Sequence, residues 1–209
     1  MKCVIIAGSP EYNIDFIKSQ INKDDFVVCA DKGYEYCKKA QITPDLIVGD
    51  FDSYDASLPE NVETIKLNPV KDDTDTLSCI RKCMEKGYKE FVILCALGGR
   101  LDHTFANLSL LLFLFKNNCT GVIKTEKESV YLISDSALKV ENLKSKTFSV
   151  FPFGCENAYI SYEGKTAYPV ENFLLKSEFP IGISNIFLED NVKISVSSGN
   201  VILIINENI

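Results

Sequence analysis

The stretch LIVGDFDSYD, Leu46 to Asp55, joins a short apolar run to a glycine and then to closely spaced aspartates. A continuous Leu-Ile-Val run bounded by turn residues predicts a strand that is buried on both faces, as in a parallel sheet. Asp50 and Asp52 lie two residues apart, so in an extended chain their carboxylates point the same way and repel each other unless a cation lies between them. An isolated pair of this kind is most simply a polar loop. The rest of the chain has to decide between these interpretations.

Similar apolar runs recur through the first 125 residues, and helical patterns lie between them. Strands are predicted over 3–8, 25–30, 45–50, 90–97 and 121–125. Residues 75–87 show helical spacing with Gly87 at the expected C-terminal end, and residues 101–116 predict a longer, largely buried helix. This alternation predicts an α/β domain over 1–125, with a mainly parallel sheet and helices on both faces.

The pattern changes near residue 125. Short alternating strands separated by turn residues follow, for example over 128–134, 146–154, 158–164, 191–200 and 201–206. No helical period of useful length appears among them. Residues 126–209 therefore predict an all-β domain that is sandwich-like or barrel-like.

Composition restricts the class of protein. The 209 residues are 46% hydrophobic and carry a net charge of −7, which argues against binding nucleic acid through its phosphate backbone. The cysteines fall in apolar runs or on helical faces, where thiols pack as small hydrophobes, and no second Cys/His pair completes a zinc site beside Cys79 and Cys83. The longest apolar run, 108–115, is too short for a membrane span, and MKCVIIAGSP predicts a strand and turn rather than a leader. A reduced, soluble, cytoplasmic protein is expected.

Each predicted strand before residue 100 is followed by a segment that contains glycine, an acidic residue or a basic residue. These segments are Gly8 to Pro10, Asp31 to Gly33, Gly49 to Ser53 and Gly98 to His103, and Lys71 to Asp75 precede a helix. Each alone is ordinary turn chemistry. In parallel sheets, ligands bind beyond the carboxyl ends of the strands. The presence of several such segments at one edge therefore predicts a functional site there.

The residue types at this edge indicate phosphate chemistry. Three carboxylates offer the hard oxygen ligands that Mg²⁺ takes together with waters and phosphates: Asp50, Asp52 and Asp75. Gly98 and Gly99 let backbone N–H groups approach a phosphate, while Arg100 and Lys71 supply cations for its oxygens. Together these groups indicate phosphoryl-type transfer.

Simpler interpretations stay open for several of these residues. The chain has neither of the two standard nucleotide-binding signatures, and no nucleophile–histidine–acid pattern. His103, the only histidine, could simply donate to a local carbonyl. Asp73 or Thr74 could be a plain helix N-cap, and Asp102 fits a cap role and a site role equally well.

Five segments give the chain a family resemblance. They are ADKG (30–33), PDLIVGDFDS (44–53), KDDTDT (71–76), GGRLDH (98–103) and GISN (182–185). In this order and spacing they resemble the thiamine pyrophosphokinases, and they extend over both halves of the chain. GDFDS alone is a weak motif, whereas GDFDS, DDTDT and GGRLDH together are highly specific.

The resemblance implies a fold, a reaction and an assembly. It implies an N-terminal α/β domain for ATP, a C-terminal β domain for thiamine and dimerisation, and a homodimer with active sites between subunits. The reaction transfers the pyrophosphoryl group of ATP to the hydroxyl of thiamine, giving thiamine diphosphate and AMP, and requires Mg²⁺. Neither nucleic acid nor a membrane is an expected partner.

The resemblance also implies roles for single residues. The magnesium-associated carboxylates would be Asp50, Asp52 and Asp75. The nucleotide side would contain Arg100 and Asp102, with Gly98 and Gly99 beside them and Asp31 and Gly33 near. Thiamine would contact Ser184 and Asn185, and Lys71 or Arg100 would stabilise charge on the transferred group. Either Asp75 or Asp52 would accept the hydroxyl proton.

Two positions depart from the family pattern. Lys32 stands where glycine is common, which changes how closely a ligand approaches the backbone or adds a cation. The chain has no tryptophan, although some members stack an aromatic ring on thiamine just after the Ser-Asn pair. Phe187 is the natural substitute, but IFLE also predicts a strand with Phe187 in the core. Tyr168 is a weaker candidate.

Three other functions are compatible with parts of the sequence. A magnesium-dependent nucleotide hydrolase would use the same acids but would not need GISN. A non-catalytic thiamine or nucleotide sensor would be expected to lose one or more of the metal acids. A purely structural protein would leave the acids at the sheet edge unexplained.

Overall fold

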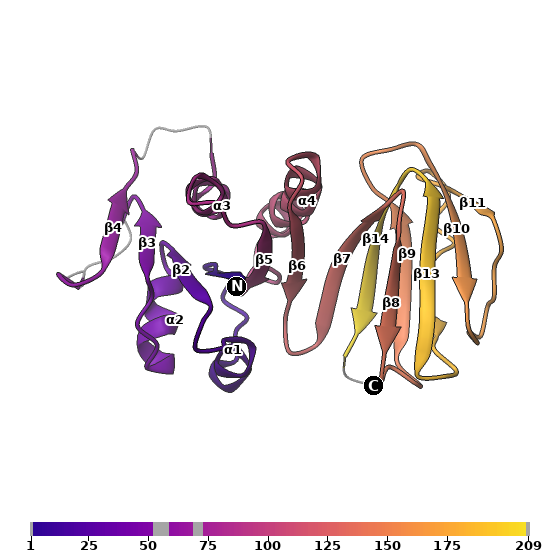
Figure 1. Cartoon of the computed structure of the whole chain (residues 1–209), viewed down its shortest axis with the longest axis horizontal. Helices are drawn as coiled ribbons and strands as arrows, with labels where there is room; N and C mark the ends of the chain where they lie inside the picture. The colour runs from indigo at the N-terminus through magenta and orange to yellow at the C-terminus, as the bar shows by residue number, and fades with distance from the viewer. Residues whose placement is uncertain (1, 52–58, 69–72, 208–209) are drawn as a thin grey trace. The chain divides into compact units, whose positions relative to one another are not determined.

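The computed structural model describes residues 2–51, 59–68 and 73–207, and the chain divides into two compact units, Met1–Thr125 and Glu126–Ile209 (Figure 1). The first unit contains a parallel sheet with helices, and the second is built from antiparallel strands. The predicted fold class is therefore confirmed.

Parallel strands form the sheet of the first unit, in the order β6-β5-β1-β2-β3-β4. Neighbouring strands run in the same direction, so their carboxyl ends share one edge. The prediction omits the edge strand β4, because its residues ETIK are mostly exposed and lack an apolar run. The strands are β1 (Cys3–Ile6), β2 (Phe26–Ala30), β3 (Leu46–Gly49), β4 (Glu63–Lys66), β5 (Glu90–Leu94) and β6 (Thr120–Lys124).

Helices cover both faces of this sheet (Figure 1). On one face α1 (Ile14–Gln20) packs against α2 (Gly33–Ala40), which contacts β1 and β2. On the other face α3 (Asp75–Glu85) contacts β1 to β3, and α4 (Leu101–Lys116) contacts β6. The two longer helices were predicted, whereas seven and eight residues give α1 and α2 too little periodicity to detect. Among the described residues, no helix combines the length and apolar composition that a membrane span requires.

Hydrogen bonds close both ends of α3. At its start the Thr74 hydroxyl accepts a hydrogen bond from the N–H of Leu77 at 3.2 Å. Just beyond its end Gly87 has a φ of 93°, and the N–H of Tyr88 donates to the carbonyl of Cys83 at 3.1 Å. This Schellman ending favours glycine, so the predicted terminal glycine of the helix is confirmed.

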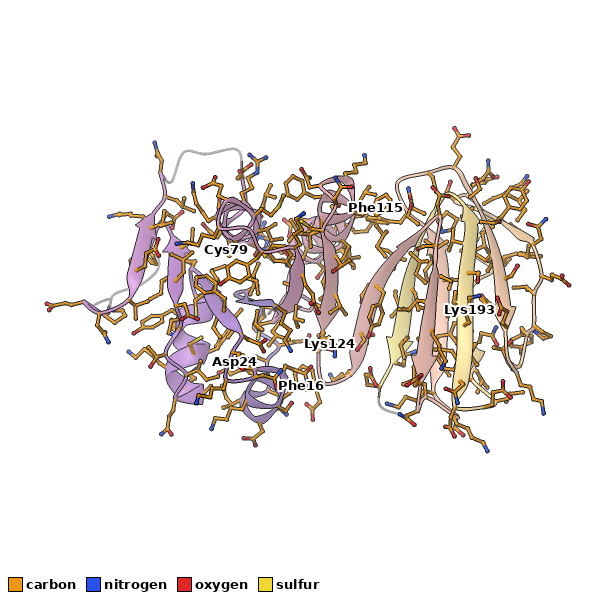
Figure 2. The ribbon with its side chains drawn as sticks, in the orientation of Figure 1. Phe16, Asp24, Cys79, Phe115, Lys124 and Lys193 are labelled. Carbon is orange, nitrogen blue, oxygen red and sulfur yellow. The ribbon has the colours of Figure 1, made fainter. Side chains whose placement is uncertain are left out.

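The cysteines are free thiols, and all of them except the half-buried Cys155 are buried. The sulfur atoms of Cys29 and Cys37 lie 2.8 Å apart, and the thiol of Cys79, labelled in Figure 2, lies 3.8 Å from the carbonyl of Cys29. Burial raises the pKa of the Cys29 thiol well above its ordinary value. These neutral thiols pack as small hydrophobes, as the sequence predicts.

Two antiparallel layers form a sandwich in the second unit. One layer has the strand order β12-β9-β14-β7 and the other has β11-β10-β13-β8. Both contribute to one core, which includes Ile133, Phe148, Ile160, Phe187 and Leu203. The strands are β7 (Glu128–Ser134), β8 (Ala137–Glu141), β9 (Thr147–Pro152), β10 (Asn157–Glu163), β11 (Phe173–Lys176), β12 (Asn185–Ile186), β13 (Asn191–Ser198) and β14 (Asn200–Asn206).

Gly33, at the start of α2, has no room for a side chain. A Cβ atom there would lie 2.0 Å from the carbonyl oxygen of Ile6, which belongs to the sheet backbone. We therefore expect Gly33→Ala to lower the free energy of unfolding by about 2 kcal/mol or more, measured by urea denaturation.

Gly8→Ala is the matched control for this substitution. Its added Cβ would meet only the Cβ atom of Lys32, at 3.3 Å, and a shift of a few tenths of an ångström at this exposed position relieves that contact. We expect a change below about 0.5 kcal/mol. Equal stability of the two alanine variants would contradict the packing argument.

Candidate active site

Asp31 and Asp50 come at the ends of the neighbouring strands β2 and β3. Asp31 has a φ of 45°, and its N–H donates to the carbonyl of Val48 at 2.8 Å. A Cβ atom on Gly49 would lie 3.0 Å from the Cα and 3.1 Å from the Oδ1 of Asp31. Glycine before Asp50 therefore lets the two acidic loops lie side by side at the sheet edge.

Gly33 belongs to the same edge, but its close approach is to protein. Because a Cβ atom at this position would collide with the Ile6 carbonyl, only glycine lets α2 begin this close to the end of β1. Lys32, which precedes it, is exposed. The geometry thus gives Gly33 a packing role whether or not a nucleotide lies near it.

The acids that precede α3 are described only in part. Asp75 is the first residue of the helix, and Thr74 rather than an aspartate is its N-cap. Asp52 and Lys71 lie outside the described residues. Within residues 2–51, 59–68 and 73–207, no three His, Cys, Asp or Glu side chains come together as a metal site.

The glycine turn after β5 precedes α4. Gly98 and Gly99 have φ values of 87° and 71°, in the region that favours glycine. Arg100 follows as the N-cap of α4, and Asp102 lies in the first helical turn. Of the two roles left open for Asp102, the structure does not give it the N-cap role, although its carboxylate accepts a hydrogen bond from the N–H of His103 at 2.8 Å.

Arg100 and Asp102 form a two-point ion pair at the surface. Arg100 Nη2 lies 2.5 Å and Nε 3.1 Å from the two carboxylate oxygens of Asp102. Hydrogen bonding to Asp102 raises the pKa of Arg100, and the same bond lowers the pKa of Asp102. With 73% of its side chain exposed, Arg100 can exchange this partner for phosphate oxygens, which suit the same planar fork.

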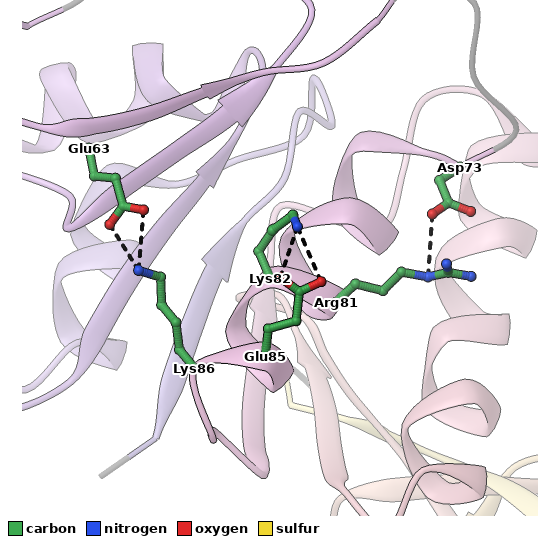
Figure 3. A network of polar contacts seen from close by, with 6 residues as sticks. All are labelled: Glu63, Asp73, Arg81, Lys82, Glu85 and Lys86. Atoms are coloured by element: carbon green, nitrogen blue, oxygen red, sulfur yellow. Dashed lines mark hydrogen bonds and ion pairs between the residues drawn. The ribbon is translucent and has the colours of Figure 1, made fainter.

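A surface pocket lies beside α3 and was not predicted. Its volume is about 480 Å³, and it is lined by Leu67, Asn68, Asp73, Ser78, Arg81, Lys82 and Glu85. Ion pairs run along this helix face (Figure 3): Asp73 with Arg81 at 3.3 Å, and Glu85 with Lys82 at 2.8 Å. Ser78, Arg81, Lys82 and Glu85 follow three- and four-residue spacing, and that signal could have identified the face from sequence.

Ser184 and Asn185 belong to the second unit and have different surroundings. Ser184 is exposed, with a φ of 58°, and its N–H donates to the hydroxyl of Ser149 at 3.0 Å. Asn185 is 6% exposed. Its Oδ1 accepts from the N–H of Tyr168 at 3.0 Å, and its Nδ2 donates to the carbonyl of the same residue at 2.8 Å. Asn185 therefore fastens the segment that carries Tyr168.

Phe187 is a core residue, and the expectation that it stacks on a substrate has to be corrected. It is 0% exposed, and its ring stacks on Phe148 with centroids 4.2 Å apart. No face of the ring is open to a ligand. Of the two roles considered for Phe187, the structure therefore supports packing in the core. Tyr168, the weaker sequence candidate, has 67% of its surface exposed.

Two family models match the chain, one within each unit. "Thiamin pyrophosphokinase, catalytic domain" matches residues 17–123, which is more than half of the chain. "Thiamin pyrophosphokinase, vitamin B1 binding domain" matches residues 135–201.

Full-length relatives carry the same name. Thiamin pyrophosphokinase 1 of Caenorhabditis elegans is 28% identical over 220 residues, covering 99% of this chain and 89% of that protein. Thiamine pyrophosphokinase of Bacillus subtilis is 25% identical over 208 residues, covering 96% of each.

Solved structures share the fold over the whole chain. The thiamine pyrophosphokinase structure from Bacillus subtilis superposes with a TM-score of 0.89 at 22% identity, covering 100% of both chains. That from Candida albicans gives 0.81 at 17% identity, covering 99% of this chain and 90% of the other.

Removing the Asn185 side chain is expected to destabilise the second unit. Asn185→Ala leaves the N–H and carbonyl of Tyr168 without their partner, so we expect a loss of about 2–4 kcal/mol in denaturant unfolding. Ser184→Ala is the control, because it keeps the backbone N–H that bonds Ser149, and it should cost less than about 0.5 kcal/mol. If both variants unfold alike, Asn185 does not fasten this segment.

Proposed function

The chain belongs to the thiamine pyrophosphokinase family, and we propose that the carboxyl edge of its parallel sheet binds magnesium and ATP for the family's reaction. The enzyme transfers the pyrophosphoryl group of ATP to the hydroxyl of thiamine, which gives thiamine diphosphate and AMP. The match of both family models in order along one chain carries this conclusion. A nucleotide hydrolase has no comparable support, because it has no use for a vitamin B1 binding domain.

The acids at the sheet edge fit a magnesium ion. The close approach of Gly49 to Asp31 leaves acidic residues at two neighbouring strand ends, and Asp50 follows directly. Mg²⁺ needs only one or two protein carboxylates, since waters and phosphates complete its shell. We assign Asp50, Asp52 and Asp75 to this ion, which when bound would neutralise charge on the phosphates.

The groups around the glycine turn would hold the nucleotide. Backbone N–H groups at Gly98 and Gly99 can approach phosphate oxygens closely, and the Arg100 guanidinium can bind two oxygens at once. Arg100 or Lys71 then stabilises charge that develops on the transferred group. Either Asp75 or Asp52 accepts the thiamine hydroxyl proton on a carboxylate oxygen. Alignment of the hydroxyl with the β-phosphorus matters more here than the basicity of that acid.

The second unit would supply the thiamine side. Ser184 is exposed at a left-handed turn and could contact thiamine directly, whereas Asn185 would act by holding the Tyr168 segment. A homodimer with active sites between subunits is expected from the resemblance to the family and is part of the proposal. A cytoplasmic location is proposed from the free buried thiols.

AMP release from ATP and Mg²⁺, with and without thiamine, tests the function. We expect AMP that depends on thiamine, with thiamine diphosphate formed in equal amount. ADP together with thiamine monophosphate would mean that a single phosphoryl group is transferred. Equal nucleotide turnover without thiamine would favour a hydrolase instead.

Asp50→Asn tests the metal assignment. Loss of one carboxylate charge should lower thiamine diphosphate formation about 10²-fold or more while the melting temperature changes little, because the residue lies at the surface edge of the sheet. Asp73→Asn is the control, since Asp73 pairs with Arg81 and should retain activity within about threefold. Near-normal turnover of Asp50→Asn would remove this residue from the metal site.

A further inference from the structure

The loop after β1 holds the glycine turn that precedes Arg100. The hydroxyl of Ser9 donates to the carbonyl of Leu97, and its oxygen also lies 3.4 Å from the carbonyl oxygen of Gly98. The N–H of Ser9 donates to the carbonyl of Cys95 at 2.9 Å. One residue therefore bonds both the start and the middle of the segment that leads to Arg100.

Two further residues of this loop pack closely against the glycine turn. A Cβ atom on Gly98 would lie 2.6 Å from Cδ of Glu11, and one on Gly99 would lie 2.8 Å from the ring of Pro10. Two successive glycines at positive φ have wide backbone freedom, so they cannot hold one conformation by themselves. The contacts from the loop supply the missing restraint.

Tyr36 of α2 forms a hydrogen bond with the backbone of this loop. Its hydroxyl donates to the carbonyl of Ser9 at 2.8 Å, and its side chain is only 1% exposed. The ring of Tyr12 stacks on that of Tyr36 with centroids 4.0 Å apart, and Lys39 donates to the Tyr12 hydroxyl at 2.7 Å. Burial raises the pKa of Tyr36 to about 12, so its hydroxyl stays a protonated donor at neutral pH.

The helix that carries Tyr36 is itself fixed to the sheet. Gly33 begins α2 in contact with the Ile6 carbonyl of β1, three residues before Tyr36. The sequence of contacts thus runs from β1 through Gly33 and Tyr36 to Ser9, and from Ser9 to the glycine turn. The step from Ile6 to Gly33 is a close backbone approach, and the steps from Tyr36 to Ser9 and from Ser9 to the turn are hydrogen bonds.

We propose that Tyr36 and Ser9 are positioning residues that set the place of the Gly98–Arg100 turn for binding the phosphates of ATP. The proposal rests on the proposed function, which assigns this turn to the nucleotide. Neither residue needs to touch the ligand. A donor group displaced by a fraction of an ångström loses much of its value in a phosphate site, so the bonds that place the turn act on nucleotide affinity.

Tyr36→Phe tests the proposal by removing one hydroxyl while keeping the ring that stacks on Tyr12. We expect KM for ATP to rise about 5- to 20-fold, with KM for thiamine within about twofold of the wild type. Calorimetry with a non-hydrolysable ATP analogue should show the same loss of affinity. Ser9→Ala, which removes the bond on the turn side, should shift the same constants in the same direction.

Tyr12→Phe is the matched control. It removes an identical hydroxyl from the neighbouring ring and breaks the bond to Lys39 rather than a bond to the loop backbone, so KM for ATP should stay within about twofold of the wild type. The proposal is overturned if Tyr36→Phe behaves like Tyr12→Phe, or if it raises the KM values of ATP and thiamine equally. A wild type that binds the analogue but makes no thiamine diphosphate would refute the proposed function, and the calorimetric comparison would still decide the positioning role.

Discussion

The parallel pairing of β1 with β2 and β5 determines where the charged groups of the first unit can lie. In this register Ile6 stands opposite both Cys29 and Leu94, so the three strands end at the same level. Ala30 stands opposite Val48, which brings β3 to that level as well. The buried strands exclude charge, and polar residues can begin only beyond them. Asp31, Asp50 and the glycine turn at Gly98, which are far apart in the sequence, therefore follow strand ends at one edge because of backbone pairing.

The glycines at this edge serve protein contacts first. Gly33 meets the backbone of β1, Gly49 meets Asp31, and Gly98 and Gly99 meet the loop after β1. A glycine-rich strand end is usually interpreted as room for a ligand, and the same absence of a Cβ also lets loops pack closely on each other. The two effects are compatible, because closely packed loops hold their backbone N–H groups in fixed positions from which such groups can bind an anion.

Elements that carry their own pattern of apolar residues could be predicted from the sequence, whereas elements held by contacts with distant residues could not. Buried strands such as Leu46–Gly49 and the long helix Leu101–Lys116 carry their own pattern of apolar residues, so the sequence identifies them. Edge strand β4 is held by pairing with β3, and its own residues carry no such signal. Site roles follow the same division. The acids and Arg100 were proposed from residue type, and the pattern of IFLE already allowed a core position for Phe187. The bonds of Asn185 depend on tertiary neighbours that no local pattern reveals.

Buried polar side chains explain how exposed groups on loops can still have fixed positions. Asn185 bonds the backbone of the Tyr168 segment, and Tyr36 bonds the backbone of the loop that contacts the turn before Arg100. Both Tyr168 and Arg100 are themselves largely exposed. An unmet buried donor or acceptor costs about 1–3 kcal/mol, so each bond strongly disfavours other loop conformations. A loop that is already ordered loses less conformational entropy when a ligand binds, which favours affinity without any additional ligand contact.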